Sequence, residues 1–263
     1  MKSRNHTLFG RMLFLFMITL FVPVVHSAGS PSLRIGFYRR SCPAAESIVR
    51  RIVRRTVSQN PGIGAGLIRL HFHDYFVRGC DGSVLLKSLP SGPKAERDHP
   101  DILRGFNIAR AKRRIERVCP NTVSCTDILA FATRDSSQIL GRINYPVPAG
   151  RRDGIVSSFN EVTQNLPSPR LTADQLIQNF ARKGLSADEM VTLSGAHSIG
   201  RSRCSSFLAE SPATRGYVDV NARYGVAWTV FYQRGCSNSG WYGRLNHVLY
   251  MMKRSILFLS YDW

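Results

Sequence analysis

The sequence lacks several patterns by which whole classes of protein are recognised. None of its six cysteines stands in a C-x-x-C pair, the spacing typical of structural zinc sites. It has no internal repeat and no low-complexity segment, so neither a solenoid nor a repetitive linker is expected. The apolar run at residues 12–25 is too short for a comfortable transmembrane span, and charged residues interrupt the last apolar segment. These absences leave an ordinary globular domain and predict no membrane span.

Acidic residues are scarce: 17 Asp and Glu face 36 Lys and Arg, for a formal net charge of +19. Such a charge favours anionic partners such as acidic polysaccharide, a membrane surface or nucleic acid. The arginines are scattered over predicted helix faces, however, which favours the simpler interpretation that they form the solvent-exposed faces of those helices. Because no recognised nucleic-acid motif is present, we expect no nucleic-acid partner.

The N-terminus has the order of a secretory signal peptide. Basic residues within the first eleven positions precede the apolar run, and the small residues Ser27 and Ala28 follow it. We therefore expect residues 1–28 to be a signal peptide and residues 29–236 to form the folded domain. The destination would be extracellular, in the cell wall, or vacuolar. In such an oxidising compartment the cysteines are expected to form disulfides.

Helical periodicity dominates the rest of the chain. It predicts helices over residues 44–58, 64–77, 110–118 and 126–140. Two capping-box patterns, at Thr172 with Gln175 and at Ser186 with Glu189, predict helices running to about residues 182 and 197. Turn-rich segments lie at residues 80–100, 145–153 and 166–169, and alternating strands are few. The predicted fold class is mostly α.

Arg69 and His73 are four residues apart on the second predicted helix and therefore share a face, with Phe72 beside it. A histidine and an arginine directed at one point place a proton acceptor beside a fixed positive charge. That pair suits cleavage of a bond in which a proton moves while negative charge develops. Taken alone, a structural polar pair is the commoner interpretation.

The residues that follow His73 supply hard oxygen ligands at short spacing. They form the pattern D-x-x-V-x-G-x-D-x-S, which consists of Asp74, Val77, Gly79, Asp81 and Ser83. Two carboxylates, a hydroxyl and loop carbonyls suit calcium, and Glu96 could join them through water. The alternative is a turn rich in Asp, Gly and Ser that binds nothing.

His197 ends the last predicted helix, and small residues flank it on both sides. Small neighbours would let a large group approach the imidazole. With the motif around His73, the residue becomes a candidate axial ligand of an iron, because neutral imidazole binds that metal. A lone histidine in this position would more often be a core residue.

Taken together, these motifs resemble those of the class III plant peroxidases. The resemblance runs from about Ser32 to Cys236, and its stretches stand in the family's order. They are F-Y-x-x-S-C-P at 37–43, R-L-H-F-H-D at 69–74, G-C-D at 79–81, R-G-F at 104–106, V-S-C-x-D-I-L at 123–129, G-R-R-D at 150–153, N-L-P-x-P at 165–169 and L-S-G-A-H at 193–197.

The resemblance implies a helical fold in which haem b lies between a distal and a proximal domain. It implies that His73 is the distal acid and base, Arg69 the stabiliser of the transition state and Phe72 a residue lining the haem. His197 would be the proximal iron ligand. The expected reaction is reduction of hydrogen peroxide and one-electron oxidation of small phenolic substrates, by a monomer. A weakly active or inactive secreted protein that binds acidic cell-wall polysaccharide is the alternative.

The resemblance also implies further sites. The segment from Asp74 to Ser83, with Glu96 in support, would be a distal calcium site, and Ser198 would be the first ligand of a proximal calcium site. Pro167 would seat phenolic substrates. The implied disulfides are Cys42 with Cys119 and Cys204 with Cys236.

The sequence departs from the family pattern at three places. Tyr75 stands where the family has the cysteine that would pair with Cys80. Only Asp101 lies near the position of an asparagine that supports the distal histidine, and a carboxylate there would raise the histidine pKa. Residues 237–263 show neither the calcium segment, nor the aspartate that supports the proximal histidine, nor the last cysteine that the family pattern would continue with. The proximal part is therefore expected to be truncated and Cys125 to lack its partner.

Overall fold

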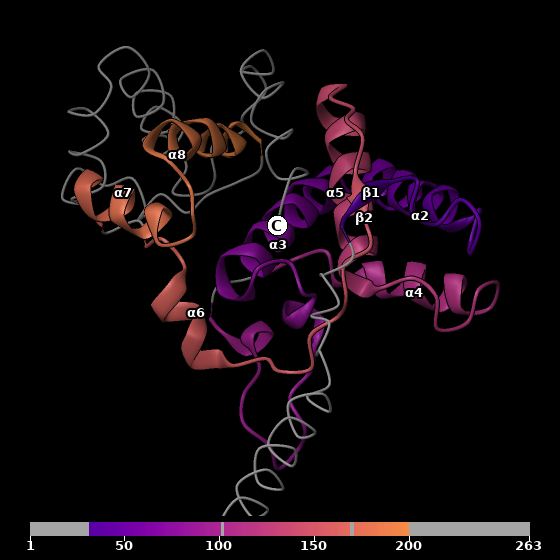
Figure 1. Ribbon diagram of the computed structural model, residues 1–263, viewed down its shortest axis with the longest axis horizontal. Coiled ribbons are helices and arrows are strands. Elements are labelled where there is room, and N and C mark those ends of the chain that lie inside the picture. The colour runs from indigo at the N-terminus through magenta and orange to yellow at the C-terminus, as the bar shows by residue number, and fades with distance from the viewer. Residues whose placement is uncertain (1–31, 101–102, 169–170, 200–263) are drawn as a thin grey trace, which may run out of the picture. The chain divides into compact units, whose positions relative to one another are not determined.

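The computed structural model describes residues 32–100, 103–168 and 171–199 (Figure 1). The helices within these ranges are α2 (Ala45–Gln59), α3 (Pro61–Arg78), α4 (Ala109–Glu116), α5 (Cys125–Gly141), α6 (Phe159–Asn165), α7 (Ala173–Ala181) and α8 (Ala187–Ser194). Two short strands, β1 (Arg34–Ile35) and β2 (Pro148–Ala149), pair antiparallel. The predicted mostly α class is confirmed, and none of the described helices is long and apolar enough to cross a membrane.

Local sequence explains where α3 begins and ends. Asn60 lies between α2 and α3, and its side chain accepts a hydrogen bond from the backbone N–H of Gly62, which caps α3. Pro61 occupies the first position of α3, where a missing N–H costs nothing. Gly79 ends α3 in the left-handed region with φ of 84°, where a side chain would be strained. The helix thus stops just before the predicted oxygen-rich loop.

Both predicted capping boxes are present at the starts of α7 and α8. The last helix ends earlier than expected, because α8 stops at Ser194 and a 3₁₀ turn, Gly195–Ser198, carries the chain onward. The seven-residue helix α6 was not predicted from the sequence. Only Val162 of α6 is buried, and so short a helix with one core residue gives no readable period.

The main hydrophobic core lies where α5 packs against α2 and α3 (Figure 1). Val49 of α2, Leu70 of α3 and Leu129 of α5 are each fully buried in it. Full burial of an aliphatic side chain contributes roughly 1.5–3 kcal/mol, so contacts of this kind hold the three helices together. The core therefore fixes the orientation of α3, which carries the predicted distal residues.

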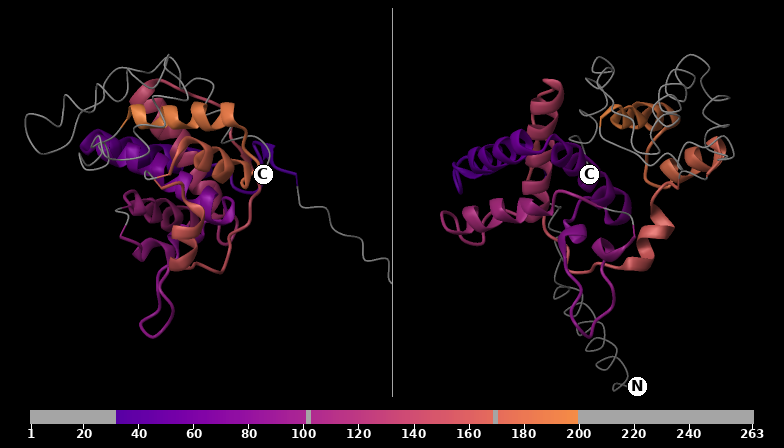
Figure 2. Two further views of the ribbon diagram at one scale, coloured as in Figure 1. Left: turned by 90° about the vertical axis from the view of Figure 1, so that its left-hand side faces the viewer. Right: turned by 180° about the vertical axis from the view of Figure 1, so that it is seen from behind.

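A second hydrophobic cluster joins the end of α3 to the neighbouring helices α7 and α8 (Figure 2). Phe76 of α3 is fully buried there, and its ring centroid lies 4.9 Å from that of Phe180 in edge contact. Leu185 and Met190 complete the cluster from the α7–α8 turn and from α8. Helix α3 thus belongs to both clusters.

Two family-like motifs that are distant in sequence meet at the start of α5. Asp153 accepts hydrogen bonds from the backbone N–H groups of Cys125 and Thr126, at 2.8 and 3.0 Å, and so caps that helix. Asp127, fully buried, forms an ion pair with Arg151 at 3.0 Å. The motif at 150–153 is therefore structural: it holds the N-terminal turn of α5.

The cysteines behave as expected where the structure describes them. Cys42 and Cys119 form a disulfide with Cα atoms 5.8 Å apart, while Cys80 and Cys125 are free. The expected signal peptide, Asp101, the pair Cys204 and Cys236, and the divergent segment 237–263 all lie outside the described residues.

Candidate functional site

Helix α3 carries the predicted distal group. His73 is 3% exposed, Arg69 lies at the surface of the described part of the chain, and Phe72 is half-buried between them and the second cluster. The Phe72 ring centroid lies 5.8 Å from that of His73 and 4.5 Å from that of Phe76. The aromatic contacts therefore hold Phe72 directly beside the buried imidazole.

Burial, the charge of Arg69 and the proximity of His99 together lower the pKa of His73 to about 3. His73 is therefore a neutral imidazole at neutral pH and able to accept a proton. The possible partner Asp101, from which a raised pKa was expected, lies outside the described residues. The groups that the structure does describe around His73 lower its pKa instead of raising it.

Several buried oxygen atoms without hydrogen-bond partners lie in the predicted calcium-binding pattern after His73 and at Glu96. Among the described residues these include Oδ1 of Asp74, Oγ of Ser83 and Oε2 of Glu96. Each of the three side chains is at most 1% exposed. The other carboxylate oxygen of Asp74 accepts a hydrogen bond from the backbone N–H of Gly82 at 3.0 Å. A buried oxygen that lacks a donor is costly unless a cation binds it.

The charges of this oxygen cluster also favour a cation. Burial, with the neighbouring carboxylates of Asp81 and Glu96, raises the pKa of Asp74 to about 7 although backbone hydrogen bonds act in the opposite direction. Burial raises the pKa of Glu96 as well, with Asp81 adding to the effect. A divalent cation bound among these carboxylates would offset their repulsion and their burial. The residues present therefore fit calcium.

The remaining predicted calcium ligands lie in the same turn. Val77 is buried in the last turn of α3 and Gly79 caps that helix, where backbone carbonyls lack helical partners. Asp81 is half-buried, and its carboxylate accepts a hydrogen bond from the backbone N–H of Ser83 at 3.0 Å. The predicted pattern thus runs from the last turns of α3 into the loop that follows the helix.

Two residues that support this loop were missed from the sequence. The Ser157 hydroxyl donates to Glu96 Oε1 at 3.2 Å and accepts from the Glu96 backbone N–H at 3.1 Å. Gly154 donates its N–H to the carbonyl of Asp81 at 2.7 Å, and a Cβ at Gly154 would collide with the Asp81 carboxylate. The sequence spacing could not predict these contacts, because Gly154 and Ser157 are distant in sequence from Asp81 and Glu96.

The predicted proximal residue His197 lies in the 3₁₀ turn after α8. The side chains of His197 and Ser198 are outside what the structure describes. Leu193, one turn earlier, borders the same second cluster as Phe72. Leu166, the neighbour of half-buried Pro167, borders it too. The second cluster therefore connects the segments that carry the distal, proximal and substrate-seating candidates.

The distal residues fit a haem by the chemistry of their donors. A neutral buried imidazole beside a guanidinium can accept a proton and stabilise an anion at one point. Phe72 adds an apolar ring next to that pair. The described residues thus supply the polar pair and the apolar ring that one face of a haem pocket requires.

Comparison with known proteins agrees with the motifs. The family profile described as Peroxidase matches residues 49–251. Peroxidase 5 of Vitis vinifera is 58% identical over 179 residues, which are 66% of this chain and 54% of that protein. Peroxidase 1 of Zea mays is 55% identical over 180 residues, or 67% of this chain and 49% of the relative. Peroxidase 39 of Arabidopsis thaliana is 44% identical over 204 residues, or 76% and 62%.

The chain spans about half the length of the first two of these relatives, at 54% and 49%. The match begins within α2 and extends through α8, so it includes the distal residues, the oxygen-rich loop and His197. It ends at residue 251, which is beyond Cys236, where the resemblance was expected to stop.

Proposed function

Since the chain belongs to the peroxidase family, we propose that it reduces hydrogen peroxide with a bound haem b and oxidises small phenolic donors in one-electron steps. The observation that carries this proposal is the buried imidazole of His73, held neutral beside Arg69 on one helix. Residues 1–28 would direct the protein to the cell wall or vacuole, where peroxide and phenols meet.

The haem would supply the iron that binds peroxide and stores the oxidising equivalents. The chain's own residues would manage the proton and the charge. An unprotonated ring nitrogen of His73 accepts the proton of hydrogen peroxide and returns it to the departing oxygen, which leaves as water. Arg69 stabilises the negative charge that develops on that oxygen as the bond breaks. Phe72 excludes water from one side of the pair.

The neutral imidazole of His197 would bind the haem iron. Pro167 would seat the phenolic donor near the haem edge. These two assignments come from their matching positions in the family motifs, and from the fact that Leu193 and Leu166 border one cluster with Phe72.

Calcium would be held by the oxygen-rich loop: Asp74, Val77, Gly79, Asp81 and Ser83, with Glu96 in support. The buried unpaired oxygens of Asp74, Ser83 and Glu96 support this assignment. Since the loop follows directly on α3, a bound calcium would hold the turn that carries His73. Ser198 would contribute to a second calcium site.

A second candidate function is adhesion to acidic cell-wall polysaccharide without appreciable catalysis. The exposed arginines of α2 favour it, since Arg50, Arg51, Arg54 and Arg55 all lie at the surface of the described structure. Retention on a pectate column that ends at raised ionic strength is expected in either case. Haem content and turnover separate the two functions.

The peroxide reaction tests the main proposal. In the full chain loaded with haem, His73→Leu should slow the reaction with peroxide at least ~10²-fold, because positioned proton transfer contributes that much. Arg69→Leu should also slow it. Arg51→Leu, on the exposed face of α2, is the control and should leave the rate unchanged. An unchanged rate in His73→Leu would refute the role of this histidine.

A further inference from the structure

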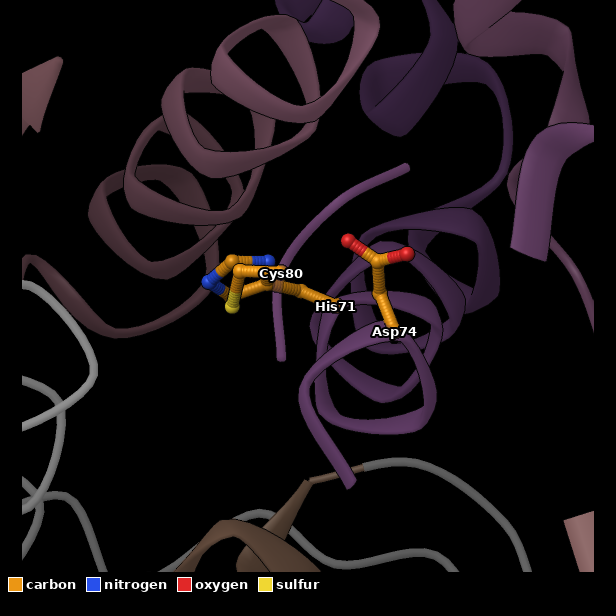
Figure 3. A group of neighbouring side chains, drawn as sticks. All are labelled: His71, Asp74 and Cys80. Atoms are coloured by element: carbon orange, nitrogen blue, oxygen red, sulfur yellow. The ribbon is translucent and has the colours of Figure 1, made fainter. Parts of the chain in front are cut away.

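We propose that His71, Asp74 and Cys80 form a buried site for zinc, distinct in chemistry from the calcium loop. One ligand atom from each side chain lies within 4.8 Å of the others (Figure 3). The exposed fractions are 2% for His71, 0% for Asp74 and 5% for Cys80. Nothing in the proposed peroxidase reaction uses His71 or Cys80.

The backbone brings these three side chains together by a simple route. His71 and Asp74 are three residues apart on α3 and so lie on one face of it. Gly79 ends the helix, and Cys80 follows with φ of 56°, which turns the chain back. The Cys80 N–H donates to the carbonyl of Asp74 at 3.3 Å, and its carbonyl accepts from the Thr126 hydroxyl at 2.7 Å. Cys80 is therefore fixed beside α3.

The thiol of Cys80 is available because Tyr75 stands where the family resemblance predicts its disulfide partner. The Tyr75 hydroxyl donates a hydrogen bond to the carbonyl of Lys183 at 2.8 Å. Cys80 forms no disulfide. A buried thiol next to an imidazole and a carboxylate is thus left with the capacity to bind a metal.

The donor set selects zinc over calcium. Calcium takes oxygen ligands, whereas zinc binds thiolate sulfur, imidazole nitrogen and carboxylate oxygen together. Zinc–sulfur bonds of about 2.3 Å and zinc–nitrogen or zinc–oxygen bonds of about 2.0–2.2 Å place tetrahedral ligands roughly 3.3–3.8 Å apart. The ligand atoms lie within 4.8 Å of one another, so they must approach by no more than about 1.5 Å, which small side-chain rotations allow.

The charges of such a site would balance. The thiolate of Cys80 and the carboxylate of Asp74 together carry the charge that neutralises Zn²⁺, so no net charge is buried. Binding replaces the S–H bond of Cys80 with a zinc–sulfur bond, and the proton leaves to solvent. The imidazole of His71 binds in its neutral form, and a water molecule would complete the tetrahedron.

Zinc K-edge X-ray absorption of the full chain tests this site without dependence on catalysis. Because Asp74 is shared with the proposed calcium loop, one equivalent of zinc is added in calcium-free buffer. The expected result is one sulfur at about 2.3 Å together with nitrogen and oxygen ligands at about 2.0–2.2 Å. A shell of nitrogen and oxygen alone would overturn the proposal, and would leave the proposed peroxidase function untouched.

Matched cysteine variants identify the sulfur. Cys80→Ser should lose the sulfur shell and weaken zinc binding in equilibrium dialysis by on the order of 100-fold. Loss of a residue that only supports a metal ligand already weakens binding by about 10- to 100-fold, so loss of a ligand should reach at least the upper end of that range. Cys125→Ser removes the other free thiol of the described chain and should change neither measurement. A sulfur shell that persists in Cys80→Ser, or disappears in Cys125→Ser, would overturn the assignment.

Discussion

The hydroxyl of Tyr75 donates a hydrogen bond of 2.8 Å to the backbone carbonyl of Lys183. Tyr75 stands where the family resemblance predicts a cysteine, and it is 4% exposed near the end of α3. Lys183 lies in the turn between α7 and α8. In place of the predicted disulfide to Cys80, Tyr75 thus makes a contact that connects α3 to the α7–α8 turn.

Removing only the hydroxyl measures that contact. Tyr75→Phe should lower the free energy of unfolding by about 1–2 kcal/mol, since the hydrogen bond is lost and the Lys183 carbonyl is left without this donor. Chemical denaturation should show a lower midpoint with an unchanged slope. Lys183→Met keeps the backbone carbonyl and should leave the effect of Tyr75→Phe intact. If Tyr75→Phe unfolds at the wild-type midpoint, the contact does not stabilise the fold.

Restoring the cysteine should not restore stability. For Tyr75→Cys, a disulfide to Cys80 closes a loop of six residues, for which chain entropy predicts a gain of about 2 kcal/mol. Loss of a buried aromatic side chain costs about 3–5 kcal/mol. We therefore expect the oxidised variant to be about 1–3 kcal/mol less stable than wild type, and Tyr75→Ala, which cannot form the bridge, to be lower still. An oxidised variant more stable than wild type would show that Tyr75 packs poorly.

Sequence patterns predicted the parts of this fold that depend on local chemistry. The bounds of α2, α3 and α5 agree with the expected ranges to within a few residues. Hydrophobic periodicity, helix-capping residues and the helix-ending Gly79 depend only on neighbouring positions in the sequence, so they could be recognised there. The short helix α6 was missed because it buries only Val162. The pairing of Cys42 with Cys119 followed from family resemblance, since cysteine spacing alone leaves the connectivity open.

The candidate site likewise has features that the local sequence predicts and features that only tertiary packing determines. The helical spacing of Arg69 and His73 was enough to predict a shared face. The lowered pKa of His73 was not predicted, because burial and the approach of His99 arise from tertiary packing. The contacts of Gly154 with Asp81 and of Ser157 with Glu96 could not be predicted from the sequence for the same reason. Local pattern identified which side chains carry chemistry, and packing determined their ionisation and their support.

The half-buried thiol of Cys125 gives a prediction about pH. Burial and the charge of nearby Asp153 raise the pKa of this thiol to about 11. Since alkylation requires the thiolate, labelling of Cys125 by iodoacetamide should still rise about tenfold per pH unit between pH 8 and pH 10. Site-resolved mass spectrometry measures the rate. In denaturant the rise should level off near pH 8.5–9; the same plateau in the folded protein would contradict the shift.

The buried pair of Asp127 and Arg151 should contribute far more to stability than the exposed pair of Arg78 and Glu161. Side-chain exposures are 0% and 6% for the first pair and 30% each for the second. Asp127 also accepts hydrogen bonds from the Tyr38 hydroxyl at 2.8 Å and from the Gly150 N–H at 2.7 Å. Its carboxylate thus connects α5 to Tyr38 and to the segment that follows β2.

Asp127→Asn should lower the free energy of unfolding by about 3–5 kcal/mol, because it leaves the buried Arg151 guanidinium without a counter-charge. Glu161→Gln, the matched change in the exposed pair, should cost only about 0.2–1 kcal/mol. Arg151→Met, combined with Asp127→Asn in a double-mutant cycle, should recover part of the loss, with a coupling energy of roughly 1–3 kcal/mol. Denaturant unfolding of the four proteins measures the cycle. Additive losses would show that Asp127 acts through Tyr38 and Gly150 alone, and that the ion pair between the two motifs adds nothing.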